Sequence, residues 1–293
     1  MIESFINYIQ FERRFSKNTS TSYRTDLLQF QEYLTATYQE PNPAKAAHGM
    51  IRSWVVTLVE QDLDASSINR KIACLRSFYK FLLRQEIIAA NPTAKIKILK
   101  TAKRLPHFVM ENDMATMLGK HDGLETTFAT LRDRLIVELL YGTGMRLSEL
   151  LELKVSQINF HDRTLKVVGK RNKERVVPFT TSLGAIIQQY LKAKQSEFNS
   201  LTDVLIVTDA GEKSYAMFVQ RIVKKQLGGY SSVEKKSPHV LRHTYATHLL
   251  NKGAEINAVK DLLGHTSLAA TQVYTHNSME KLKRVFDQAH PKA

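Results

Sequence analysis

Hydrophobic positions in the first hundred residues recur at helical spacing. Three segments each carry an apolar stripe of residues mostly three or four apart, which is the pattern of a helix with one buried face. The stripes consist of Tyr23, Leu27, Phe30 and Leu34; of Ile51, Trp54, Val55 and Leu58; and of Ile68, Ile72, Leu75, Tyr79 and Leu82. The pattern predicts a compact helical domain over residues 1–98.

The third segment also carries a group of cations that its apolar stripe leaves outside. These are Arg70, Lys71, Arg76, Lys80 and Arg84. Such a row could line a phosphate backbone, and a solvated helix face would carry the same residues. From the first domain alone, the favoured interpretation is that these cations lie on a solvated helix face.

A basic segment without clear periodicity separates this domain from the rest of the chain. Asn91-Pro92 is expected to stop the preceding helix, and IKILKTAKRLPHF contains Pro106. We therefore predict a linker over residues 99–106 and a second domain over 107–293. Two domains linked in this way could close around a duplex.

The second domain alternates helices with a few short strands. A helix is expected through about Tyr141, followed by a turn that contains Gly142, Gly144 and Arg146. The runs INF, TLKVV and ERVVPF alternate apolar and polar residues, which predicts antiparallel strands joined by tight turns. Lys170 falls at the tip of the second turn. The predicted fold is mainly α with a small antiparallel β-sheet.

A further helix is expected from Pro238, because Ser237 suits the N-cap and proline suits the first turn. Leu241, Tyr245 and Leu249 are spaced by four and are predicted to face the core. His239 and Arg242 are three apart, so we expect them to share the other face.

Two more candidate side chains follow. INAVKDLL predicts a helix that Gly264 ends, with His265 directly beyond it. Tyr274 lies on a short segment nine residues later. Each of these residues alone is more often structural than chemical; together with His239 and Arg242 they could hold a phosphate, transfer protons and supply an oxygen nucleophile.

Composition favours a polyanionic partner. The chain of 293 residues has a formal net charge of +14, and both predicted domains are basic. A merely soluble surface would explain the charge equally well. The single Cys74 excludes an intrachain disulfide, and no segment has the length of apolar residues that a membrane span needs. We expect a cytoplasmic, nucleoid-associated protein.

The motifs GTGMRLSELLEL, VVGKRNKERVVPF, PHVLRHTYATHLL, LLGHTSLAATQVYTH and the closing HPKA occur in order. The chain thereby resembles the tyrosine site-specific recombinases of the phage integrase family, closest to their bacterial Xer branch. The resemblance implies an N-terminal helical core-binding domain, a SAM-like bundle, and a C-terminal α+β catalytic domain. Residues 1–98 match less specifically than 107–293.

The resemblance also assigns roles to residues. It implies that Glu149 supports the site without performing chemistry. One departure is Arg171, where related turns commonly have glycine, which makes the conformation of the loop around Lys170 less certain. The implied catalytic residues are Arg146, Lys170, His239, Arg242, His265 and the nucleophile Tyr274.

Family membership would imply cutting and rejoining of DNA through a 3′-phosphotyrosyl intermediate and a Holliday junction. No G-x-x-x-x-G-K-[ST] loop or cluster of carboxylates suggests ATP or metal ions, so no cofactor is expected. The implied partners are double-stranded DNA with an inverted-repeat site, a homo-tetramer or a hetero-tetramer with a paralogous recombinase, and a DNA translocase as activator. The apolar stripe of the C-terminal segment, Met279, Leu282, Val285 and Phe286, is expected to dock on a neighbouring protomer, or else on its own domain.

Several alternatives stay open. Chromosome-dimer resolution is expected, with integration of a mobile element or plasmid resolution as the alternative. A type IB topoisomerase or a telomere resolvase would use much the same residues. A DNA-binding protein that has lost catalysis would lack at least one of the six catalytic positions, and none is altered here.

Overall fold

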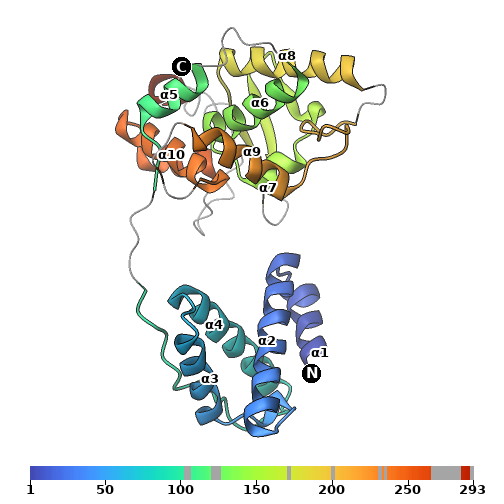
Figure 1. The fold of residues 1–293 in the computed structure, drawn as a ribbon, viewed down its shortest axis with the longest axis vertical. Coiled ribbons are helices and arrows are strands. Elements are labelled where there is room, and N and C mark those ends of the chain that lie inside the picture. The colour runs from blue at the N-terminus through green and yellow to red at the C-terminus, as the bar shows by residue number, and fades with distance from the viewer. Residues whose placement is uncertain are drawn as a thin grey trace. The chain divides into compact units, whose positions relative to one another are not determined.

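A computed structural model describes residues 1–101, 107–119, 127–169, 173–198, 202–229, 233, 236–264 and 285–290. The predicted catalytic residues Lys170, His265 and Tyr274 lie outside these residues. The chain forms two compact units, Met1–Arg104 and Leu105–Ala293 (Figure 1).

The first unit is a bundle of helices around one apolar core. Its elements are α1 (Ile2–Asn7), the π-helix η1 (Tyr8–Glu12), α2 (Lys17–Tyr38), the 3-10 helix η2 (Pro43–Lys45), α3 (His48–Glu60) and α4 (Ala65–Arg84). The three predicted apolar stripes lie on α2, α3 and α4, and nearly all of their members are buried. The exception is Tyr23, which is partly exposed. Helical spacing thus located this core correctly.

Helix α4 differs from the sequence prediction at two points. It ends at Arg84, well before Asn91-Pro92, and the chain turns at Glu86 with a positive φ of 56°. Lys71 is buried, although the pattern left it outside the apolar stripe. Its ammonium donates to Asp26 at 2.9 Å and to Gln29, and it lies 5.8 Å from the ring centre of Trp54.

The buried carboxylate of Asp26 explains why Lys71 turns inward. Asp26 is 1% exposed and also accepts from Arg70, so two cations neutralise a charge that would be costly to bury alone. A helical stripe predicts which side of a helix is apolar, but it does not reveal a buried acid on a neighbouring helix.

The chain after α4 runs back along the same helix. The side-chain amide of Asn69 donates to the carbonyl of Leu99 at 2.9 Å and accepts from the Leu99 amide at 2.8 Å. Arg76 donates to the carbonyl of Ile96, whose side chain is buried in the core. These contacts fasten the chain to the first unit as far as Leu99.

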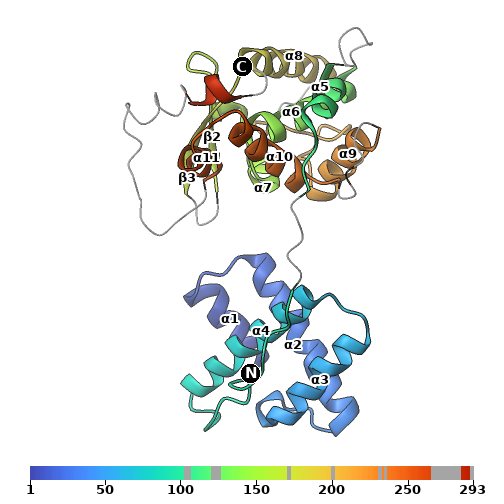
Figure 2. The ribbon, with the colours of Figure 1, turned by 90° about the vertical axis from the view of Figure 1, so that its left-hand side faces the viewer.

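The second unit combines helices with a small sheet (Figure 2). Its elements are α5 (Glu111–Gly119), α6 (Phe128–Thr143), α7 (Leu147–Glu152), the 3-10 helix η3 (Val155–Gln157), β1 (Ile158–Asn159), β2 (Thr164–Val168), β3 (Glu174–Pro178), α8 (Thr181–Glu197), α9 (Ala216–Gly228), α10 (Pro238–Asn251) and α11 (Ile256–Leu263). The strands are antiparallel in the order β1-β2-β3, and Val167 pairs with Arg175. The predicted fold class, mainly α with a small antiparallel sheet, is confirmed.

Helix α6 forms the centre of this unit. Nearly every residue from Leu135 to Thr143 is buried, and α8 and α10 pack against it. Leu241, Tyr245 and Leu249 of α10 are fully buried, as their spacing predicted. Helix α10 begins at Pro238, and α11 ends at Leu263 with Gly264 as its C-cap, both as the sequence predicted.

A buried histidine ties the start of the second unit to its core. His248 Nε2 lies 2.9 Å from the carbonyl of Val109, and Nδ1 lies 2.9 Å from the hydroxyl of Tyr141. Because a carbonyl only accepts, Nε2 carries the proton and Nδ1 accepts from the tyrosine. The amide of Val109 also donates to Thr244 at 3.0 Å. The segment before α5 is therefore held against α10.

The described part of the C-terminal segment packs within its own unit. Phe286 is fully buried, and a ring nitrogen of His290 lies 3.0 Å from the carbonyl of Gly142. Met279 and Leu282, the other end of the predicted docking stripe, lie outside the described residues. Among the helices that the structure describes, none is long and apolar enough to cross a membrane.

Candidate active site

The turn between α6 and α7 presents Arg146. Gly144 ends α6 in the left-handed conformation with a φ of 61°. A Cβ at this position would lie 2.4 Å from Cδ1 of Tyr245 and 2.8 Å from Leu263, so glycine is required by both backbone and space. Arg146 then occupies the N-cap position of α7. The tight contact with α10 and α11 fixes where this arginine leaves the backbone.

Glu149 holds Arg146 from both ends. Its carboxylate accepts the Arg146 backbone amide at 2.7 Å and the Arg146 guanidinium at 2.8 Å. The first contact satisfies a free amide at the start of α7, as in a capping box. The Arg146 guanidinium also donates to the carbonyl of Gly264 at 3.1 Å, and its side chain remains 33% exposed. Arg146 is thus oriented by the protein and still open to a ligand.

Arg242 reaches the same place from α10. It donates to the carbonyl of Gly144 at 2.5 Å and to that of Leu263 at 2.7 Å. Burial and the neighbouring charges of Arg146 and Arg175 lower the pKa of Arg242 to about 10, so it stays protonated at neutral pH. The two arginines, far apart in the sequence, meet beside the C-terminal end of α11.

A third arginine, which the sequence analysis did not single out, completes the cluster. Arg175 of β3 donates to both oxygens of Glu149, at 2.6 and 2.8 Å, and to the carbonyl of Leu262 at 3.2 Å. Three consecutive carbonyls at the end of α11, those of Leu262, Leu263 and Gly264, therefore each accept from a different arginine. The last carbonyls of a helix lack partners within it and carry a partial negative charge, which favours cations there.

Arg146 and Arg175 share the carboxylate of Glu149. Burial alone would raise its pKa, but the hydrogen bonds and charge of Arg175, together with the contacts of Arg146, outweigh burial and lower it. Glu149 is therefore ionised at neutral pH. Three guanidinium groups against one carboxylate leave the cluster with an excess of positive charge, which suits a phosphate ligand.

His239 lies on α10 one turn before Arg242. Its side chain is exposed, whereas that of Arg242 is buried, so the two candidates differ in their access to solvent. The structure therefore brings together Arg146, Glu149 and Arg242 and leaves His239 open near the start of the same helix. Lys170, His265 and Tyr274 fall outside the described residues. The residues before Lys170 and His265 are described: Gly169 borders Glu149 and Arg175, and Gly264 borders Arg175.

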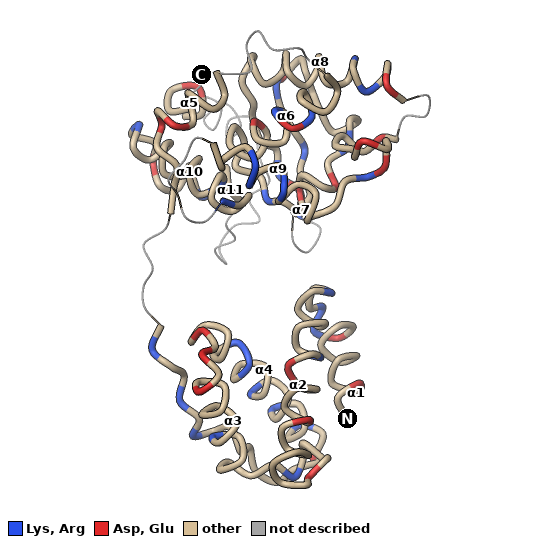
Figure 3. Tube along the Cα trace, in the orientation of Figure 1, with Lys and Arg blue, Asp and Glu red and all other residues tan. Residues whose placement is uncertain are grey.

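The predicted cations of the first unit follow α4 (Figure 3). Arg70, Arg76, Lys80 and Arg84 are exposed, while Lys71 is not. Arg70 pairs with Asp26, and Arg84 donates to the hydroxyl of Tyr8 at 2.5 Å. The exposed set forms a basic face that a duplex could contact.

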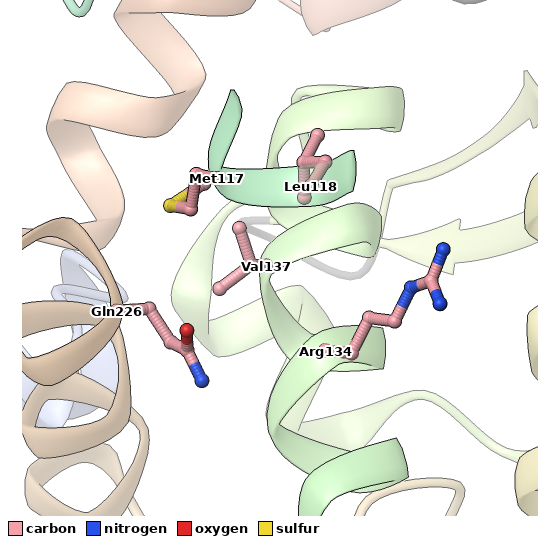
Figure 4. A pocket seen from close by; sticks show the side chains of 5 residues that line it. All are labelled: Met117, Leu118, Arg134, Val137 and Gln226. Atoms are coloured by element: carbon pink, nitrogen blue, oxygen red, sulfur yellow. The ribbon is translucent and has the colours of Figure 1, made fainter. Parts of the chain in front are cut away.

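Two hollows of the described residues are lined by side chains outside the arginine cluster. A small apolar recess lies among α5, α6 and α9 and is lined by Met117, Leu118, Arg134, Val137 and Gln226 (Figure 4). A larger, open hollow of about 570 Å³ lies along α9 and the chain that precedes it. Within the described ranges, no three side chains of His, Cys, Asp and Glu gather as metal ligands would.

Arg175 could have been found from the sequence by a stricter reading of strand alternation. In ERVVPF, Arg175 and Val177 lie two apart and so share one face of the strand, and Val177 is apolar. An arginine on a core face needs a buried partner. The pattern therefore indicates that Arg175 has a buried partner, but it does not identify that partner as Glu149.

The family models match both units. The phage integrase family matches residues 108–281, and the phage integrase N-terminal SAM-like domain matches residues 2–86. Proteins named tyrosine recombinase XerC are 33% identical in Chlorobaculum parvum, 36% in Listeria monocytogenes and 37% in Staphylococcus aureus. These matches cover 99–100% of this chain and 94–97% of the relatives.

Solved structures agree in fold. The XerH site-specific recombinase bound to palindromic difH substrate has a TM-score of 0.72 at 20% identity, over 97% of this chain and 83% of that one. The Tn1549 transposon integrase in complex with transposon right-end DNA has a TM-score of 0.74 at 17% identity, over 97% and 98%.

The chain belongs to the phage integrase family, and as a member of it the protein is an enzyme that breaks and rejoins DNA strands. Within that family it is a Xer-like tyrosine recombinase, as its similarity to the XerC proteins over the full chain indicates.

Proposed function

We propose that this recombinase transfers a DNA strand to Tyr274 and then to a new 5′ hydroxyl. The tyrosine oxygen bonds to phosphorus while the bond from phosphorus to the 5′ oxygen breaks, which leaves a 3′-phosphotyrosyl link. Lys170 gives its proton to the departing 5′ oxygen. His239 or His265 receives the tyrosine proton or hydrogen-bonds the phosphate.

The observation that supports this chemistry is the convergence of Arg146 and Arg242 on adjacent carbonyls directly before His265. In the proposed step their guanidinium groups hold the nonbridging oxygens, where negative charge grows as the tyrosine attacks. Loss of one such donor typically costs about 3–4 kcal/mol, or about 10²- to 10³-fold in rate. The excess positive charge around Glu149 matches that growing charge.

Strand transfer of this kind needs no cofactor, because the phosphotyrosyl link conserves the phosphate for the reverse step. The experiment is a nicked suicide duplex that carries a site selected from random sequences. Wild type should form a covalent protein–DNA product, and Tyr274→Phe should form none. Product formation should persist in a chelator; activity that a chelator abolishes and magnesium restores would reject the metal-free mechanism.

The proposed division of labour follows the two units. Residues 1–98 bind the duplex as a core-binding domain, and residues 107–293 perform the chemistry. Residues 99–106 link the two domains. The cations that contact the phosphate backbone of the DNA are Arg70, Arg76, Lys80 and Arg84. The buried ammonium of Lys71 is assigned to the fold of the first unit. Supporting this, solved relatives by fold include recombinases bound to their DNA substrates.

We propose that four protomers act on two duplexes with an inverted-repeat site and pass through a Holliday junction. Docking of the C-terminal segment on a neighbour would couple their sites. Deletion of residues 279–293 would remove Phe286 from the core of the second unit, so the deletion would impair folding as well as docking. A Met279→Glu, Leu282→Glu double variant is the better test: cleavage of an isolated half-site should persist while pairing of two duplexes fails. Normal pairing would contradict docking in trans.

Resolution of chromosome dimers is the cellular role that full-length similarity to XerC proteins supports. A plasmid with two directly repeated copies of the selected site provides the assay. Resolution by the purified chain alone would favour a single-recombinase system. A requirement for a paralogous recombinase or a DNA translocase would favour the paired system. Integration of a mobile element is the alternative, and it predicts recombination between two unlike sites.

A further inference from the structure

We propose that Arg175 is a positioning residue that sets Arg146 and the end of α11 for phosphate binding. The inference deepens the proposed function and rests on it, since it assumes that Arg146 holds the phosphate. The side chain of Arg175 is 6% exposed, and its Nε, Nη1 and Nη2 all donate to Glu149 or Leu262, so it acts through these neighbours.

The first link runs through Glu149. Arg175 donates to both carboxylate oxygens, and Arg146 donates to Oε1, the same oxygen that Arg175 Nη1 contacts at 2.6 Å. Paired contacts from a planar guanidinium fix the plane of the carboxylate as well as its position. Rotation of Glu149 would displace the Arg146 guanidinium directly. Arg175 therefore determines the direction in which Arg146 is held.

The second link runs to the end of α11. Arg175 Nε donates to the carbonyl of Leu262, and its side chain packs against Gly264, where an added Cβ would lie 2.9 Å from Arg175 Cδ. The same helix end accepts Arg242 at Leu263 and Arg146 at Gly264. Arg175 thereby fixes the peptide that leads into His265.

The third link concerns the hairpin between β2 and β3. The amide of Gly169 donates to the carbonyl of Lys173 at 2.7 Å, and a Cβ at Gly169 would lie 3.3 Å from Glu149 Oε1. Arg175 lies on β3, two residues after Lys173. The side chain of Arg175 thus contacts Glu149, which holds Arg146, and the end of α11. It also borders Gly169 in the hairpin between β2 and β3.

Arginine is suited to this position because it presents five donors in a fixed plane. Lysine would keep the charge but could not meet Glu149 and Leu262 in one geometry. Methionine would keep the approximate length and lose every hydrogen bond. The rate of strand cleavage should therefore fall from wild type to Arg175→Lys and fall further in Arg175→Met.

The test measures single-turnover formation of the covalent product on a nicked suicide duplex that carries the selected site. Arg175→Met should slow this step about 100-fold, the size of effect that a misplacement of about 1 Å produces, with DNA affinity unchanged. Arg175→Lys should fall between this variant and wild type. The decisive variant combines Arg175→Met with Arg146→Ala. If Arg175 acts by orienting Arg146 and the end of α11, the defects should not multiply: the double variant should be slower than Arg146→Ala alone by much less than the factor that Arg175→Met costs in wild type.

The matched control is Arg132→Met. Arg132 is a buried arginine of the same unit, held by Asp133 and Asp209 away from the arginine cluster. The Arg132→Met substitution should lower the melting temperature and leave the rate per folded molecule unchanged.

Three outcomes would overturn the role of Arg175. These are defects that multiply in the double variant, a wild-type rate for Arg175→Met, and equal slowing by Arg132→Met. If Arg175→Met does not fold, Arg175→Lys with and without Arg146→Ala decides the question in the same way. Absence of product from wild type would instead defeat the proposed function itself.

Discussion

Arg146 and Arg175 donate to the same atom, Oε1 of Glu149, at 2.8 and 2.6 Å. The two guanidinium groups would repel each other without the carboxylate between them. The shared oxygen therefore joins a partly exposed arginine, Arg146, to a buried one, Arg175. The charge of Glu149 is what allows both to remain in place.

Glu149→Gln should destabilise the second unit strongly. Removal of one partner from a buried ion pair typically costs about 3–5 kcal/mol, because the remaining charges lose their compensation. The free energy of unfolding from urea titration at neutral pH measures this cost. A change below about 1 kcal/mol would mean that the carboxylate is not needed to compensate the arginines.

The same carboxylate should make stability depend on acid. The pKa of Glu149 is lowered in the folded state, so its contribution is present above the unfolded glutamate pKa of about 4.3 and is lost as the pH falls through the folded pKa. Wild type should lose more unfolding free energy than Glu149→Gln between neutral pH and the acid range. Parallel curves for the two proteins would contradict the assignment.

Gly144→Ala should disrupt the turn that carries Arg146. The added methyl group meets Tyr245 and Leu263 at short distances, and the φ of 61° disfavours any side chain. We expect a loss of at least about 2 kcal/mol in unfolding free energy and an almost complete loss of DNA cleavage. Gly228→Ala on α9 is the control, since nothing lies within 4 Å of the added group. It should be neutral or slightly stabilising.

Two lysines of α4 should give opposite phenotypes. Lys71→Met leaves Asp26 with only Arg70 and should lower the stability of the first unit by about 1–3 kcal/mol. Lys80→Met removes an exposed cation, so stability should hold while DNA affinity falls and the salt dependence of binding weakens by about one phosphate contact. Fluorescence anisotropy across a salt series, with thermal unfolding alongside, separates these outcomes. An unchanged salt slope for Lys80→Met would remove it from the proposed DNA contacts.

His248 should destabilise the second unit as the pH falls. Burial lowers its pKa, so the neutral ring is favoured in the folded state, and its contribution is present above about pH 6.5 and declines below that value. Protonation would place a second hydrogen on Nδ1, which must accept from Tyr141. His248→Gln should reduce the loss of unfolding free energy between pH 8 and pH 5 relative to wild type.

Local sequence patterns predicted the helices of this protein and their buried faces well. They did not predict contacts between residues far apart in the sequence. The stripes on α2 and α4, the start of α10 at Pro238 and the stop of α11 at Gly264 depend on neighbouring residues, and each was found where expected. The burial of Lys71 depends on Asp26, which lies 45 positions away on another helix. Likewise, the partner of Arg175 is 26 positions away. Such pairs follow from tertiary packing, which no spacing rule contains.

Helix α11 has only 8 residues, and a helix of that length is marginal in water on its own. Its terminal carbonyls nevertheless serve Arg146, Arg175 and Arg242 at once. Local opening of this one helix would remove one hydrogen-bond partner from each of the three arginines at once, whereas its folded form keeps all three contacts in place. With the proposed catalytic roles of these arginines, we expect the rate of strand cleavage to follow the fraction of time that α11 is folded, and a substitution that weakens its packing should slow cleavage from a distance.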